Sequence, residues 1–140
     1  MTKGVFIAVA LLLLLCAGCS KKNNDNVVTK LPPSAAKLTF PAQNSACITD
    51  TLDADDQIQI TFTWNTSANT AGYELIITNL SNNKIIIETT PSNQLTIPLD
   101  FNYSYSWYVV STNNEVTATA QSAIWKFYLA GPGGCPVSLN

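Results

Sequence analysis

The stretch LDFNYSYSWYVVSTNN, from Leu99 to Asn114, alternates in character residue by residue. Large side chains recur at steps of two at Tyr105, Trp107 and Val109, which is the period of a β-strand and not of a helix. If these three side chains point inward, Tyr108 and the residue two positions after it must point outward. The stretch therefore predicts a strand with a buried face and a second, partly apolar face.

Similar short runs, separated by turn residues, continue on both sides of this strand. Ile58, Ile60, Phe62 and Trp64 alternate strictly and are predicted to share a buried face. Pro98 is expected to face outward on an edge strand, because proline cannot donate a ladder hydrogen bond. The predicted strands are Leu38–Phe40, Ile58–Trp64, Tyr73–Thr78, Ile85–Thr89, Leu95–Leu99, Tyr105–Val109 and Trp125–Leu129. We therefore expect an all-β fold, a seven-stranded antiparallel β-sandwich.

The residues from Leu38 to about Ala130 resemble a fibronectin type III domain. The resemblance lies in the order of Trp64, Tyr73 and a pattern that comprises Leu99, Tyr105, Trp107, Val109, Ser111 and Asn113. It implies a tyrosine corner, in which the Tyr105 hydroxyl bonds back to backbone near Leu99. The usual Pro-Gly after the leucine is missing, and an unrelated seven-stranded sandwich is the alternative.

Composition excludes several classes of function. The chain has 140 residues, a formal net charge of -2 and no histidine, and its basic residues are all lysines. A nucleic-acid partner needs a basic face, which this balance does not supply. Without histidine no serine, cysteine or threonine nucleophile has the usual base, and no glycine-rich phosphate loop is present. We therefore predict one domain that is not an enzyme and binds no cofactor or metal.

The N-terminal segment resembles a bacterial lipoprotein signal. Val5–Leu15 is an apolar run of eleven residues, too short to cross a bilayer, and Ala17 and Gly18 precede a cysteine. The resemblance implies cleavage of residues 1–18 and acylation of Cys19 with fatty acids such as palmitate, which would anchor the chain in a lipid bilayer. Cys16 stands where the family usually has leucine. The alternative is an ordinary secretory signal that leaves Cys19 as a free thiol.

In such lipoproteins a serine directly after the lipidated cysteine, here Ser20, favours sorting to the outer membrane. The sequence does not specify on which side of that membrane the domain lies. Residues 19–37 are polar, contain a proline pair and are interpreted as a flexible tether, while residues 131–140 form a C-terminal tail. Thus the domain itself is expected to span residues 38–130.

Two cysteines remain after the signal and the anchor, Cys47 and Cys135. Strands one and seven of an alternating run point the same way, so both cysteines are expected at the same end of the sandwich. A disulfide in an oxidising compartment would close a long loop and contribute about 4 to 5 kcal/mol of stability in the loop-entropy model. The alternative is a pair of separate buried thiols.

A cluster of aspartates lies between residues 50 and 56. Its spacing matches no EF-hand loop, so a solvated acidic loop is favoured over a calcium site. Asp50-Thr51-Leu52 also resembles a short bacterial acceptor motif for O-glycosylation at Thr51.

The outward residues of the predicted sheet give the candidate binding face, which consists of Ile76, Tyr108, Val110 and Tyr128. Contiguous apolar surface marks contact sites, although scattered surface residues are the plain alternative. These observations predict a non-catalytic, lipid-anchored binding module of the cell envelope that mediates protein–protein interaction or adhesion. The alternative function is glycan binding as an accessory to polysaccharide uptake.

Overall fold

The computed structural model describes residues 30–48, 57–132 and 134. This part of the chain contains strands and no helix, so none of its segments is a helix able to cross a membrane. The strands are β1 (Lys37–Phe40), β2 (Ser45–Ile48), β3 (Ile58–Asn65), β4 (Gly72–Asn79), β5 (Ile85–Thr90), β6 (Gln94–Leu99), β7 (Tyr103–Thr112), β8 (Ala120–Gln121) and β9 (Trp125–Leu129).

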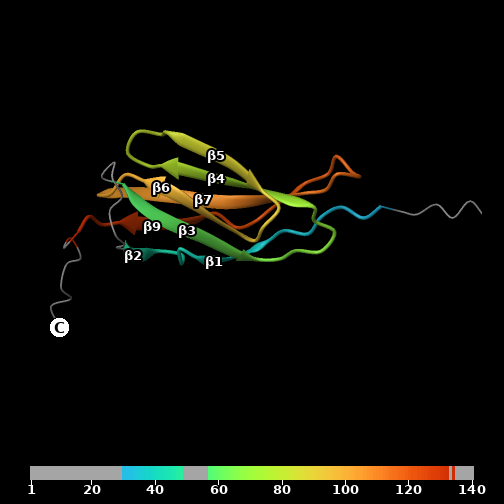
Figure 1. The fold of residues 1–140 in the computed structure, drawn as a ribbon, viewed down its shortest axis with the longest axis horizontal. Helices are drawn as coiled ribbons and strands as arrows, with labels where there is room; N and C mark the ends of the chain where they lie inside the picture. Colours follow the sequence, from blue (N-terminus) through green and yellow to red (C-terminus); the bar gives the residue numbers. More distant parts are fainter. Residues whose placement is uncertain (1–29, 49–56, 133, 135–140) are drawn as a thin grey trace, which may run out of the picture.

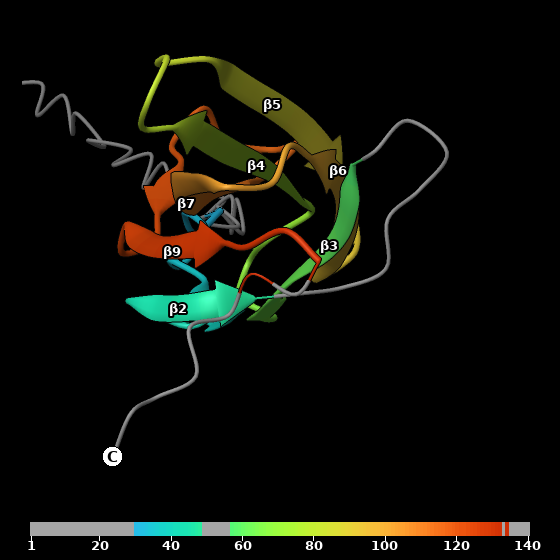
Figure 2. The same cartoon turned by 90° about the vertical axis from the view of Figure 1, so that its left-hand side faces the viewer.

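The strands form two sheets that face each other. One sheet has the order β1-β3-β6, and the other has the order β2-β9-β7-β4-β5, with the short β8 paired to β7. Figure 1 shows the long strands running side by side, and Figure 2, turned by 90°, shows the row from β2 to β5 opposite β3 and β6. The predicted all-β sandwich is confirmed, and each of the seven predicted strands is present.

Two short strands, β2 and β8, were not predicted. β2 pairs with β9 in parallel, the exception to the antiparallel pairing of the other described strands. The chain leaves the first sheet after β1 at the cis bond between Phe40 and Pro41, and enters the second sheet as β2. Neither short segment has a long alternating pattern. Pairing with β9, far along the chain, defines β2, and pairing with the preceding strand β7 defines β8.

The core lies between the two sheets. Ile58, Ile60, Phe62 and Trp64 of β3 are each at most 1% exposed, as their alternation predicts. The Phe62 ring packs edge-on against Trp107 of β7 at 5.0 Å and against Phe127 of β9 at 5.9 Å. Interlocking aromatic side chains from the two sheets therefore hold the layers together.

Each sheet has two edges, and these differ in how they are protected. β1 and β2 are only four residues long, and β6 carries the exposed Pro98, as predicted for an edge. β5 has six residues and no proline, and its Ile85 and Ile87 are 58% and 55% exposed. β5 thus has more strongly exposed apolar side chains than β1 and β6, the edge strands whose side chains are fully described.

Candidate interaction face

The sheet β2-β9-β7-β4-β5 carries a row of apolar residues on its outer face, which points away from the core. Ile76 of β4 lies directly opposite Ile87 of β5 on one side and Tyr108 of β7 on the other. Side chains directly opposite each other in an antiparallel sheet share a face and touch. We call Ile87, Ile76 and Tyr108 the outer apolar row, and three neighbouring strands contribute one residue each.

Neighbouring side chains determine how much of each residue in the outer apolar row is exposed. Ile76 is only 7% exposed, which corrects the expectation that it is part of the open surface. It sits at the centre of the row, where the side chains of Ile87 and Tyr108 flank it across the strands. Tyr108 is half-buried, and so is Val110, which lies two residues further along the same strand opposite Glu74. The accessible part of the face is therefore formed by the residues around Ile76.

The predicted face is divided in the structure. Tyr128 of β9 is 37% exposed but lies opposite Ser104, four residues before Tyr108 on β7. This separates the two tyrosines by roughly 13 Å along the strand direction. Ser106 and Lys126, which face each other, stand between them. Tyr108 and Tyr128 lie on the same side of the sheet, but they do not form one contiguous patch.

Tyr128 instead lines a shallow groove of about 280 Å³. Exposed Leu80 and the polar residues Asn44, Ser104 and Lys126 contribute to the same groove. An aromatic ring beside hydroxyl, amide and ammonium groups is the chemistry of a small polar ligand site, although the groove is open to solvent.

Sequence reasoning missed Ile85 and Ile87 as surface residues. Ile85, Ile86 and Ile87 follow one another without alternation, so the pattern gave no sign of which side chain faces which way. Their pairing with β4 settles this, because Ile87 lies opposite outward-facing Ile76 while Ile86 lies opposite core residue Ile77.

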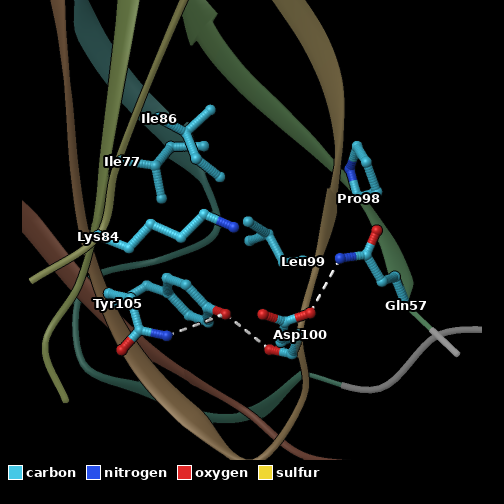
Figure 3. A pocket seen from close by; sticks show the side chains of 9 residues that line it. Gln57, Ile77, Lys84, Ile86, Pro98, Leu99, Asp100 and Tyr105 are labelled. Atoms are coloured by element: carbon cyan, nitrogen blue, oxygen red, sulfur yellow. Dashed lines mark hydrogen bonds between the residues drawn. The ribbon is translucent and has the colours of Figure 1, made fainter. Parts of the chain in front are cut away.

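The predicted tyrosine corner, Leu99 and Tyr105, lies at the end of the sandwich where the chain passes from β6 to β7. The Tyr105 hydroxyl donates a hydrogen bond of 2.7 Å to the backbone carbonyl of Asp100, next to Leu99 (Figure 3). The amide of Asn79 lies 3.5 Å from the same hydroxyl. Burial, and to a smaller extent the negative charge of Asp100, raise the pKa of Tyr105 to about 12. Tyr105 thus fastens the β6–β7 connection to the core.

The pocket beside Tyr105 is too small to be a ligand site. Its volume is about 20 Å³, room for about one water molecule. Lys84, Asp100 and Gln57 line its mouth, and Gln57 donates a hydrogen bond of 2.9 Å to the Asp100 carboxylate (Figure 3). Gln57 precedes β3 and Asp100 follows β6, so this bond joins the ends of two neighbouring strands of one sheet.

Several predicted sites fall outside the described residues. These are Cys19, Cys135, the segment from Asp50 to Asp56 and, within it, Thr51; the side chain of Cys47 in β2 is also outside. In the described ranges, no group of three or more His, Cys, Asp or Glu side chains is placed to hold a metal ion. The structure therefore leaves the disulfide, the lipid anchor, the calcium alternative and the glycosylation motif as predictions.

Comparison with known proteins identifies the fold and no activity. No protein-family model matches the sequence, and no curated protein gives a significant match. A solved structure described as a myokine is 11% identical, covers 70% of this chain and 98% of its own, and has a TM-score of 0.50. The fn3 domain of human collagen alpha-1(XX) chain is 15% identical, with coverage of 81% and 98% and a TM-score of 0.48. A structure described as FN3tt mut is 14% identical, with coverage of 69% and 89% and a TM-score of 0.40.

At these identities a likeness concerns the fold alone. The two-sheet strand order and the hydrogen bond from Tyr105 to Asp100 agree with the resemblance seen in the sequence. The chain therefore has a fibronectin type III-like β-sandwich fold.

Proposed function

We propose that this protein is a non-catalytic module of the bacterial cell envelope, anchored by a lipid on Cys19, that binds a protein partner through the outer apolar row. The observation that carries the proposal is the row itself, with Ile87 55% exposed and neighbouring Ile85 58% exposed. Contiguous apolar surface marks a contact site more reliably than a single exposed apolar side chain.

The shape and chemistry of the row favour a protein over a sugar. Two of its three side chains are isoleucines, which bury well against apolar side chains but offer no flat ring for a sugar to stack on. Tyr108 supplies an aromatic ring with a polar tip, a residue type enriched at protein interfaces. Glu74 and Thr78, the outward neighbours of Ile76 on β4, give the row a polar border.

The contact can be tested in intact cells of the source bacterium. A photo-crosslinking amino acid at position 110, beside Tyr108, should capture one specific protein, and Tyr108→Glu should abolish the capture. Gln94→Glu is the matched control, because it adds the same charge on exposed β6 of the other sheet. Equal capture by both charged variants would place the binding site elsewhere.

The anchor is tested separately by feeding the cells a palmitate analogue that can be tagged after lysis. Label should appear in the wild type and in Cys16→Ala, and should be lost in Cys19→Ala. If Cys19→Ala retained the label, or if the wild type carried none, the anchor at Cys19 would be wrong whatever the outcome of the crosslinking.

Glycan binding remains a second candidate, and the Tyr128 groove favours it. Tyr128 offers a partly exposed ring, and Ser104 and Lys126 lie beside it as hydrogen-bonding groups. A glycan array of wild type, Tyr128→Ala and Tyr108→Ala distinguishes the two sites. Binding that Tyr128→Ala removes and Tyr108→Ala preserves would support the groove, while an empty array would argue against it.

A further inference from the structure

The edge of β5 is open to pairing with another strand. An exposed, flat and hydrophobic edge is a template for pairing with another chain, and proteins commonly blunt such edges by shortness, proline or charge. β1 and β2 are short and β6 carries a proline, whereas β5 has six residues, no proline and two strongly exposed isoleucines, with Glu88 as its one charged residue. Figure 2 shows β5 at the outer end of its sheet, with no other labelled strand beyond it.

The backbone of β5 is oriented for such pairing. The amide of Asn79 in β4 donates a hydrogen bond of 2.9 Å to the carbonyl of Lys84, so Lys84 directs this group toward β4. In an antiparallel ladder this direction alternates along the strand. Ile86 and Glu88 therefore bond toward β4, and the backbone groups of Ile85 and Ile87 point outward from the edge.

The sequence of β5 complements itself in one register. Residues opposite each other in an antiparallel pair share a face. When two copies of β5 pair around a two-fold axis, the axis must therefore lie between one residue and the same residue of the second copy. With the axis at Ile86, Lys84 lies opposite Glu88 of a second copy, and Ile85 lies opposite Ile87 of that copy.

Neighbouring registers are poorer. An axis at Ile85 sets Lys84 against Ile86, an axis at Ile87 sets Ile86 against Glu88, and an axis at Glu88 sets two like charges against each other. The salt bridge found among the described residues joins Lys30 to Glu115, so neither Lys84 nor Glu88 has an ion-pair partner in this part of the chain. A second copy can therefore pair with both charges without breaking an ion pair in the described part of the chain.

We propose that two copies of this protein associate through antiparallel pairing of their β5 strands, centred on Ile86. The pairing continues each sheet into the sheet of the other copy and places side chains beside the two exposed isoleucines of β5, whose outer side stays open. It also joins the two outer apolar rows, because Ile87 of one copy then lies beside Ile85 of the other. The inference goes beyond the proposed function and depends neither on the lipid anchor nor on a partner protein.

The test is charge reversal in the full-length protein, purified in mild detergent and examined by sedimentation. The wild type should form dimers and no larger species. Lys84→Glu and Glu88→Lys should each raise the dimer dissociation constant on the order of tenfold, because each replaces two attractive cross-strand pairs with repulsive ones. The double variant should restore the affinity of the wild type.

Mixing gives a sharper control. Lys84→Glu has glutamate at both positions and Glu88→Lys has lysine at both, so an equimolar mixture should form heterodimers although neither variant dimerises well alone. Loss of folding could not produce this recovery. A monomeric wild type, or a mixture that stays monomeric, would overturn the proposal; a dimer unaffected by any of these charges would place the interface elsewhere.

A backbone variant tests the ladder itself. Ile87→Pro removes an amide that points outward and leaves the bonds to β4 intact, and Pro98 shows that this fold accepts proline on an edge strand. We expect Ile87→Pro to be a folded monomer by circular dichroism and sedimentation. A folded Ile87→Pro that still dimerises would contradict pairing through β5.

Discussion

Ile76 and Ile77 are neighbours on β4 and the same residue type, yet they belong to different parts of the molecule. Ile77 is 0% exposed and lies in the core between the sheets, whereas Ile76 is 7% exposed on the outer face between Ile87 and Tyr108. The same contrast separates Trp107 from Tyr108 on β7. Local alternation sends the two side chains to opposite faces, but one face becomes core only because a second sheet covers it.

The largest effect is expected on the covered face. Trp107→Ala should lower the free energy of unfolding by about 3–5 kcal/mol, because it leaves a cavity where Phe62 and Trp125 pack against the indole ring. Urea unfolding measures the change. If Trp107→Ala lowered the free energy of unfolding by less than an outer-face variant such as Tyr108→Ala does, the division between a core face and an open face would be contradicted.

The two isoleucines give the most direct test of this division. Ile77→Ala should cost about 2–5 kcal/mol, as for a fully buried side chain. Ile76→Ala should cost about 1–2 kcal/mol, because its neighbours on the outer face enclose it from the sides and solvent can fill the space above it. Equal losses in urea unfolding would mean that the outer face is as closely packed as the core.

Tyr105→Phe tests the end of the covered face. Loss of the hydrogen bond to the Asp100 carbonyl should cost about 0.5–1.5 kcal/mol near neutral pH. The free energy of unfolding of the wild type should also fall in alkali. The unfolded chain loses the Tyr105 phenol proton near pH 10, while the pKa of Tyr105 in the folded chain is about 12. This stabilisation is complete below about pH 10 and is lost as the pH rises toward about 12. Unfolding measured across this window should decline less steeply in Tyr105→Phe than in the wild type.

The smallest effect on stability is expected on the open face. Tyr108→Ala should change the free energy of unfolding by no more than about 1 kcal/mol, since the ring is half-buried and covered by no second sheet. The same variant should abolish partner binding. A stability loss comparable to that of Trp107→Ala would assign Tyr108 to the core and remove it from the interaction face.

The sequence predicted the faces better than it predicted the surface patch. Strict alternation in β3 and β7 assigned Trp64, Tyr105 and Trp107 to the core, where each is at most 3% exposed. The separation of Tyr108 from Tyr128 was not predictable, because it depends on the register between β7 and β9. The role of Ile87 was missed because three successive isoleucines show no period.

By itself, the sequence determined seven of the nine described strands and, where residues alternate as in β3 and β7, which side of the strand is apolar. Side-chain direction in a strand is a local property with a period of two. Only the tertiary structure decided which strands are neighbours, and so which outward side chains form the outer apolar row and which edge stays open. Those features depend on hydrogen-bond register between segments far apart in the chain, such as β4 with β7 and β2 with β9. Local alternation carries no information about that register.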